Sequence, residues 1–292
     1  MKLSVVIPAR NEAGNIGATL DDLRARLAAD GIPYELIVVS DGSTDATDEE
    51  VRARSATDPG VVLVRNPGPH GFGWAVRRGL DTFSGDAVVI AMADGSDAPN
   101  DVVAYYRILR DRAECAFGSR FMAGARVVGY PRLKLVMNRL VNLGIRVLFG
   151  LRYNDVTNAF KGYRAHVIDG CRPLLSPHFN LTVELPLKAI VRGYSWEVVP
   201  TSWQQRSHGE SSLRLKEMGS RYLFIILIVW LEKLLTRIGR TTWARPRPPA
   251  SSHPCSTSRV VPVTVDAPWC AGYEPPRMPQ RASASARRVD VG

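Results

Sequence analysis

Three clusters of polar and acidic residues near the start of the chain carry side chains suited to binding a nucleotide. They are residues 8–12, 40–45 and 93–97, and each directly follows a short apolar run. Carboxylates such as those of Glu12 and Asp41 can accept hydrogen bonds from a ribose or a base. The carboxylate of Asp94 could also hold Mg²⁺ against a diphosphate, because this cation commonly shares one or two carboxylates with substrate phosphates.

Each cluster also has a plain structural interpretation. Asn11 could cap the helix that follows the first cluster, and the hydroxyl of Ser43 could cap the helix after the second. Asp94-Gly95 is a common turn pair. A turn explains any single cluster at least as well as a ligand does, but such turns at successive strand ends make this interpretation less attractive.

A glycine pair, Gly71 and Gly73, precedes a further helical pattern. Such a pair is a weak signal for a phosphate-binding loop. The Lys-Ser/Thr of a Walker motif is missing here, which disfavours a P-loop. Close packing of the helix on a sheet explains the glycines equally well.

Apolar runs and helical spacings alternate along the first half of the chain. This alternation predicts βαβ units and an α/β fold with a mostly parallel sheet flanked by helices. In such sheets the ligand site lies beyond the carboxyl ends of the strands, where the three polar clusters fall. The expected strands are 3–7, 34–39, 61–64, 87–92 and 115–118, and the expected helices are 16–29, 45–55, 74–83 and 102–112.

Two later segments have the composition of helices at a membrane surface. Residues 131–150 combine a wide apolar face with Lys134, Arg139 and Arg146. Residues 222–231 are apolar all round but shorter than the roughly 20 residues that a spanning helix needs, and basic residues flank them. We therefore expect an interfacial or re-entrant membrane helix here, with a buried core helix as the alternative.

The net charge of +10 suits nucleic acid, anionic lipid or a phosphorylated substrate. Half of that excess lies in residues 239–292, which hold eight Arg and three acidic residues among many Pro, Ser and Ala. This composition predicts a disordered tail. Because the charge is concentrated there and no recognition motif is present, we expect no nucleic-acid partner.

The four cysteines are scattered and show no metal-binding spacing. No signal peptide precedes the first strand. Together these features predict a reducing, cytosolic setting without structural disulfides.

The ordered set of motifs resembles glycosyltransferase family 2, and within it the dolichol-phosphate mannose synthase-like branch, over residues 3–238. Each motif is modest, and their order carries the resemblance. The matching pieces are Pro8-Ala9-x-Asn11-Glu12, Asp41-Gly42-Ser43-x-Asp45, Gly71-x-Gly73-x-Ala75-x-x-x-Gly79, Ala93-Asp94, Gly118-Ser119-Arg120, Asp155-x-Thr157-x-Ala159-Phe160-Lys161-x-Tyr163-Arg164, Glu184, Arg192-Gly193-Tyr194 and Arg206-x-x-Gly209-Glu210-Ser211.

The resemblance implies a GT-A fold that binds a nucleotide-diphosphate sugar together with Mg²⁺ or Mn²⁺. Implied catalytic residues are Asp94, Arg120 and Lys134. Implied nucleotide-sugar contacts are Pro8, Ala9, Asn11, Glu12, Asp41, Ser43 and Asp94. Implied contacts to an acceptor phosphate are Arg120, Lys134, Asn138 and Arg206. Implied metal ligands are Asp94, Ser96 and Asp97.

The chain departs from the family pattern at four positions. Met92 stands at the first position of the usual Asp-x-Asp metal motif, which removes one candidate ligand, and Asp97 could compensate. Ser40 replaces a commonly acidic residue. Lys134 stands where this branch usually has Arg, and Asn138 where it often has Ser.

The expected function is inverting transfer of a hexose from GDP-mannose or UDP-glucose to a polyprenyl phosphate, at the cytosolic face of a membrane. We expect a GT-A domain over residues 1–215, a membrane-associated helix over 216–238 and the tail over 239–292. Two alternatives stay open. One is the same fold acting on a glycan or other saccharide acceptor, and the other is a non-catalytic nucleotide-sugar binder, which Met92 motivates. The pattern leaves the oligomeric state open.

Overall fold

The computed structural model describes residues 1–204 and 215–238. Its main feature is a seven-stranded sheet in the order β3-β2-β1-β4-β7-β5-β8. All neighbouring strands are parallel except that β7 runs antiparallel to β4 and β5. The strands are β1 (Leu3–Ala9), β2 (Tyr34–Ser40), β3 (Val61–Arg65), β4 (Ala87–Ile90), β5 (Cys115–Ser119), β7 (Lys161–Arg164) and β8 (Trp196–Pro200).

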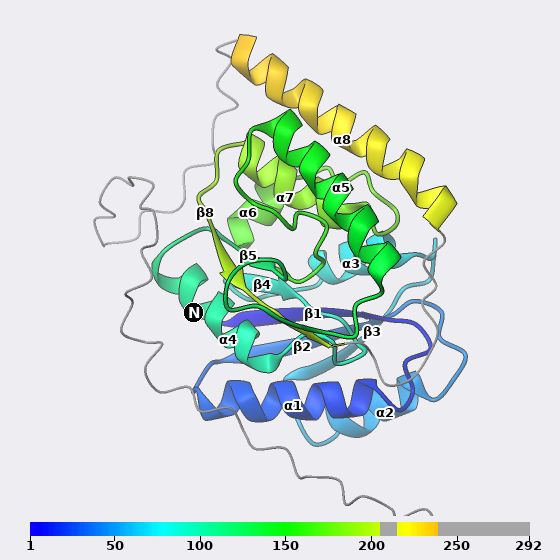
Figure 1. The fold of residues 1–292 in the computed structure, drawn as a ribbon. Helices are drawn as coiled ribbons and strands as arrows, with labels where there is room; N and C mark the ends of the chain where they lie inside the picture. The colour runs from blue at the N-terminus through cyan, green and yellow to red at the C-terminus, as the bar shows by residue number, and fades with distance from the viewer. Residues whose placement is uncertain (205–214, 239–292) are drawn as a thin grey trace, which may run out of the picture. The chain divides into compact units, whose positions relative to one another are not determined.

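Helices cover both faces of this sheet (Figure 1). Because successive side chains of a strand point to opposite faces, Leu3, Val5 and Ile7 of β1 join one buried cluster, while Val6 joins the other. The first cluster is covered by α1 (Ile16–Ala29), α2 (Thr47–Ser55) and α4 (Pro99–Asp111). The second is covered by α3 (Phe72–Leu80), α6 (Ala165–Gly170) and α7 (Leu181–Val191).

Two long helices, α5 (Arg132–Phe149) and α8 (Leu215–Ile238), extend the second layer outward (Figure 1). Val229 of α8 is fully buried in the second cluster. An ion pair of 2.7 Å joins Arg192, just after α7, to Glu232 of α8. Nζ of Lys233 donates to the carbonyl of Phe149 at the end of α5 over 2.6 Å. These contacts hold α8 against the α5–α7 side of the domain.

A small parallel sheet of β6 (Arg126–Val128) and β9 (Ser202–Gln204) lies apart from the main sheet. Asp97 forms an isolated bridge to Trp203 of β9, which ties this small sheet to the loop after β4.

The α/β architecture with a mostly parallel sheet confirms the expected fold class. Several predicted boundaries were wrong by a few residues. β4 ends at Ile90 and not at residue 92, because the N–H of Met92 donates to the carboxylate of Asp97 and so leaves the ladder. α4 begins at Pro99, before the predicted start at 102, since proline fits the first turn of a helix. α3 begins two residues before its predicted start.

The apolar run 222–231 forms the middle of the 24-residue helix α8. Among the helices of the described segments, none is long and apolar enough to cross a membrane. The tail predicted for 239–292 and the candidate Arg206 lie outside the described residues.

Candidate active site

The loops after β1 and β2 are joined at the carboxyl edge of the sheet. The N–H of Asp41 donates to the carbonyl of Ala9 over 2.9 Å. Oδ1 of Asn11 accepts the N–H of Thr44 at 2.8 Å, and the N–H of Asn11 donates to Oγ of Ser43. Asn11 therefore links the two loops. It does not cap α1, which begins at Ile16.

Glu12 continues this link. Its N–H donates to Oγ1 of Thr47 over 2.8 Å, and its carboxylate accepts a hydrogen bond from Asn15. The candidate nucleotide residues of the first two clusters are thus brought together: Pro8 and Ala9 at the end of β1, and Asn11, Glu12, Asp41 and Ser43 in the two linked loops.

The carboxylate of Asp41 organises the loop between β3 and α3. Its Oδ1 accepts Nδ2 of Asn66 at 2.6 Å and lies 3.0 Å from Nδ1 of His70, and its Oδ2 accepts the N–H of Gly71 at 2.7 Å. The imidazole of His70 lies over Gly42, where an added Cβ would be 3.0 Å from Cε1. Sequence reasoning missed Asn66 and His70, because only their contact with Asp41 marks them.

The glycine pair packs α3 closely against the segment before α7. A Cβ on Gly73 would lie 2.4 Å from the carbonyl oxygen of Ser176. The rings of Phe72 and Phe179 stack with centroids 4.2 Å apart. These contacts support the packing interpretation of the glycines.

The third cluster forms a tight loop after β4. Oδ1 of Asp94 accepts the N–H of Ser96 at 3.1 Å, and Oδ2 of Asp97 accepts the N–H of Met92 at 2.9 Å. Burial, together with the nearby charge of Asp94, raises the pKa of Asp97 to about 7, although the Met92 N–H and Arg120 oppose the rise. A positive charge placed beside this carboxyl would favour its ionised form.

The carboxylates of this loop suit a divalent cation that is bound together with substrate. Within residues 1–204 and 215–238 no group of three or more His, Cys, Asp or Glu side chains could hold a metal without other ligands. Mg²⁺ commonly takes one or two carboxylates and completes its shell with substrate phosphates and water. Asp94 and Asp97 fit that mode of binding.

Arg120 is buried and held in one orientation. Its guanidinium donates to both oxygens of the fully buried Asp155 at 2.8 Å, and its side chain is 10% exposed. Charge-assisted bidentate pairs fix geometry as well as adding energy. The pair of Arg120 and Asp155 is therefore a buried ion pair and not a surface one.

The ring of Tyr130 lies beside residues that are expected to bind the acceptor phosphate. The guanidinium carbon of Arg120 lies 5.5 Å from the ring centroid of Tyr130, and Nζ of Lys134 lies 5.8 Å from it. Nδ2 of Asn138 donates to Oγ1 of Thr157 at 2.9 Å and reaches the Tyr130 hydroxyl at 3.5 Å. We call Arg120, Tyr130, Lys134 and Asn138 the cation cluster.

The cation cluster adjoins the loop of residues 92–97 after β4, which we call the carboxylate loop. The ring of Trp203 lies 5.1 Å from that of Tyr130, and the backbone of Trp203 pairs with Asp97. Sequence reasoning missed Tyr130. The available signal was an aromatic residue directly before the cationic helix. The arrangement places two positively charged side chains near a loop whose carboxylates suit a divalent cation.

Several known proteins resemble this chain in sequence. A family model described as "Glycosyl transferase family 2" matches residues 4–172. A dolichol-phosphate mannosyltransferase of Pyrococcus furiosus is 32% identical over 222 residues, which are 74% of this chain and 60% of that protein. An undecaprenyl-phosphate mannosyltransferase of Micrococcus luteus is 27% identical, with 73% and 88% covered. A polyprenol monophosphomannose synthase of Mycolicibacterium smegmatis is 28% identical, with 72% and 80% covered.

Solved structures share the fold. Glucosyl-3-phosphoglycerate synthase from Mycobacterium tuberculosis, in complex with uridine diphosphate, superposes with a TM-score of 0.60 at 21% identity, covering 78% of this chain and 80% of that one. The same enzyme with Mn²⁺, uridine diphosphate and phosphoglyceric acid gives a TM-score of 0.58 at 22% identity, covering 82% and 78%.

Proposed function

The chain belongs to glycosyl transferase family 2, as its motifs predict, and on that premise we propose that it transfers a hexose from a nucleotide-diphosphate sugar to a polyprenyl phosphate. The observation that carries the proposal is the cation cluster beside the carboxylate loop at the carboxyl edge of the sheet. The names of the relatives favour a prenyl phosphate acceptor and a mannose donor. UDP-glucose is the second donor to test, beside GDP-mannose.

On the donor side, the nucleoside would lie between the linked loops that follow β1 and β2. Asp41 already accepts hydrogen bonds from Asn66 and Gly71 and contacts His70. A carboxylate offers about four lone-pair sites, so one remains for a ribose or base. The internal contacts fix its position before substrate arrives.

On the acceptor side, the chemistry needs little help from a general base. A prenyl phosphate oxygen is already anionic at neutral pH, so the barrier lies in bringing two anions together. Arg120, oriented by Asp155, and Lys134 would neutralise the acceptor phosphate. The phosphate oxygen attacks the anomeric carbon from the face opposite the diphosphate, and the carbon–oxygen bond to the diphosphate breaks with inversion.

Asp94, with Asp97 beside it, would hold a divalent cation, Mg²⁺ or Mn²⁺. When bound, such a cation supplies positive charge that stabilises the leaving nucleoside diphosphate. Ser96 contributes its N–H to Asp94 and so shapes the loop.

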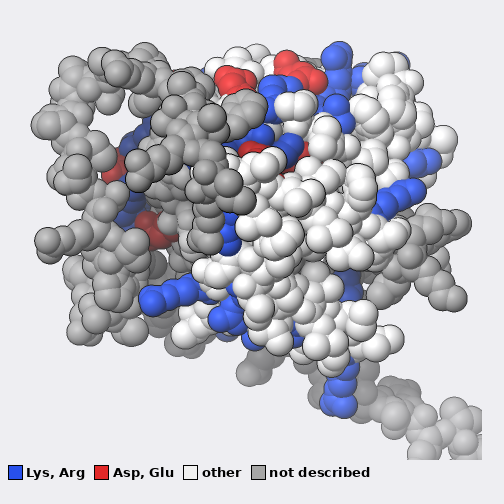
Figure 2. Space-filling model, turned by 90° about the horizontal axis from the view of Figure 1, so that it is seen from above, with Lys and Arg blue, Asp and Glu red and all other residues white. Residues whose placement is uncertain are grey.

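The outer helices support placement at a membrane surface, and we propose that this is the cytosolic face. α5 and α8 leave a broad set of large apolar side chains exposed, and Figure 2 shows uncharged residues over the middle of this face with Lys and Arg around them. Such a surface fits the interface of a bilayer that holds a prenyl chain. The exposed residues are Leu133, Val136, Met137, Leu140, Val141, Leu143 and Val147 on α5, and Leu223, Phe224, Leu227, Leu231 and Leu235 on α8.

One observation bears on the alternative of a non-catalytic binder. Met92 removes a carboxylate from the usual motif, but the Asp97 carboxylate lies 2.9 Å from the backbone nitrogen of Met92. A carboxylate is thus present beside the position of the missing one. This favours an enzyme over a degenerate nucleotide-sugar binder.

The test is turnover on membranes that contain the full chain. GDP-mannose and UDP-glucose would be offered separately, with or without a prenyl phosphate, and with Mg²⁺, Mn²⁺ or EDTA. Metal-dependent labelling of the lipid that is lost in Asp94→Ala and in Asp97→Asn is expected. Donor binding without turnover under every condition would instead support the degenerate binder, and transfer that needs no prenyl phosphate would indicate another acceptor.

A further inference from the structure

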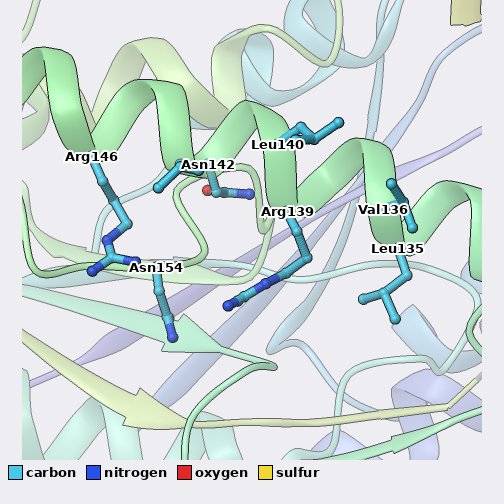
Figure 3. Close-up of a pocket in the computed structure, with 8 residues that line it drawn as sticks. Leu135, Val136, Arg139, Leu140, Asn142, Arg146 and Asn154 are labelled. Atoms are coloured by element: carbon cyan, nitrogen blue, oxygen red, sulfur yellow. The ribbon is translucent and has the colours of Figure 1, made fainter.

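A cavity of about 380 Å³ lies along α5, outside the cation cluster. Neither Arg120 nor Lys134 lines it. Figure 3 shows that Arg139 and Arg146 extend from α5 to one side, on which Asn154 of the segment after the helix also lies. The lining residues are Leu135, Val136, Arg139, Leu140, Asn142, Leu143, Arg146 and Asn154.

The polar side of this cavity carries positive charge that the described residues do not neutralise. Among them, no Asp or Glu lines the cavity. Within the described part of the chain, neither Arg139 nor Arg146 forms an ion pair, and Nε of Arg146 is buried without a hydrogen-bond partner. A buried polar group is normally hydrogen-bonded, so an orphaned guanidinium nitrogen points to an absent acceptor. Arg139 only stacks on Phe121, with its guanidinium carbon 5.0 Å from the ring centroid.

The other side of the cavity is apolar and opens to the surface. Val136, Leu140 and Leu143 line it, and they are 54%, 58% and 53% exposed. They form the stripe of α5 next to the stripe of Leu135, Arg139, Asn142 and Arg146, because positions three and four apart share one face of a helix. The cavity therefore suits a ligand with an anionic group and attached apolar chains.

We propose that this cavity binds the phosphate headgroup of an anionic membrane phospholipid, at a site distinct from that of the acceptor phosphate. Guanidinium groups bind phosphate with strong, charge-assisted hydrogen bonds. Arg139 and Arg146 contact the phosphate, and the lipid chains lie against Val136, Leu140 and Leu143. The amides of Asn142 and Asn154 also line the cavity, but they already donate to Thr157 and to the carbonyl of Phe121. The inference rests on the membrane placement in the proposed function, not on glycosyl transfer itself.

The test uses the full chain and a short-chain lipid below its micellar concentration. Dihexanoyl phosphatidylglycerol would be titrated by calorimetry, with dihexanoyl phosphatidylcholine and glycerol 3-phosphate in parallel. We expect saturable binding of the phosphatidylglycerol, at least about tenfold tighter than either comparison ligand. The choline of phosphatidylcholine cancels the charge of its phosphate, and glycerol 3-phosphate has no apolar chains. The double variant R139Q/R146Q should lose at least about tenfold in affinity.

The matched control is R126Q/R132Q, which removes the same charge from exposed positions that do not line the cavity. It should stay within about twofold of the parent, since diffuse attraction alone is weak for a monomeric ligand. Equal losses in both double variants would overturn the site. Glycerol 3-phosphate binding as tightly as the lipid would show a site for free phosphate instead.

Lipid binding is measured here without donor or prenyl phosphate. An inactive protein that still binds phosphatidylglycerol through Arg139 and Arg146 would contradict the proposed reaction but keep the cavity proposal. Turnover without selective binding of phosphatidylglycerol would contradict the cavity proposal but keep the proposed reaction.

Discussion

At position 42 a glycine shapes the candidate nucleotide site. Gly42 has a φ of 73°, and a Cβ there would also press on His70. The left-handed conformation costs an L-residue roughly 1–2 kcal/mol. Gly42→Ala should therefore lower stability and also displace His70 from Asp41, which would weaken donor binding by about tenfold. Urea denaturation and calorimetric titration of the donor measure the two effects.

Gly31→Ala is the control for that change. Gly31 has a φ of 62°, and no atom lies within 4 Å of an added Cβ. It should lose similar stability and keep its donor affinity. If donor affinity were the same in both variants, His70 would not belong to the nucleotide site.

Asp155 is expected to act by positioning Arg120. Removing one partner of a buried ion pair leaves an uncompensated charge and costs about 3–5 kcal/mol. Asp155→Asn should lose stability on this scale and also lose turnover, because Arg120 is no longer held toward Tyr130. Chemical denaturation and initial rates measure the two effects.

The exposed pair of Arg110 and Asp111, joined at 2.7 Å, supplies the control. Asp111→Asn should cost less than about 1 kcal/mol, as exposed pairs do. Should the folded fraction of Asp155→Asn retain full turnover with prenyl phosphate, Arg120 would have no role at the acceptor.

At the scale of elements, α8 joins the domain to the proposed membrane surface. Its buried side carries Ile225 and Val229, while Phe224 and Leu231 are 67% and 52% exposed. Phe224→Ser with Leu231→Ser should lower binding to vesicles of neutral lipid by at least about tenfold, because each large apolar side chain contributes on the order of 1–3 kcal/mol when buried. Flotation with vesicles measures the binding.

Stability should change little in that variant, since neither side chain is buried in the fold. Leu175→Ser, which changes a residue that is 49% exposed outside α5 and α8, is the control and should bind vesicles as the parent does. Unaltered vesicle binding in the α8 variant would remove this helix from the membrane surface.

The elements that the sequence predicted are those with strong local periodicity. β1 and β2 are short β-branched runs, and α1 has apolar residues at helical spacing, so local pattern sufficed. β7 reads Lys-Gly-Tyr-Arg and shows no alternation. Its antiparallel place between β4 and β5 is set by pairing with strands far along the chain, which periodicity does not report.

The same limit applies to the whole molecule and its candidate site. Asp41 and Asp94 stand at strand ends, where fold class alone directs attention. Only contacts with residues that are distant in the sequence or on another loop mark Asn66, His70 and Tyr130 as candidate site residues. A single sequence carries no record of those contacts, so these residues could be found only in the folded chain.

Resistance to acid is a property of the whole molecule that one buried carboxylate should influence. Glu35 on β2 accepts hydrogen bonds from Lys2, Ser4 and Ser84, and so joins three distant segments. Burial alone would raise the pKa of Glu35, but these hydrogen bonds outweigh it and lower the pKa to about 2, from 4.5. The folded state thus favours the ionised form.

A depressed carboxyl pKa contributes stability that is fully present above pH 4.5 and is lost as pH falls from 4.5 toward 2. Glu35→Gln should therefore lower stability by up to about 3 kcal/mol near pH 7. The difference from the parent should shrink steadily below pH 4.5. Thermal unfolding followed from pH 7 to pH 2 measures this convergence. Glu49→Gln, at a side chain 66% exposed, should run parallel to the parent, and a Glu35→Gln curve that also ran parallel would assign the acid sensitivity to other carboxylates.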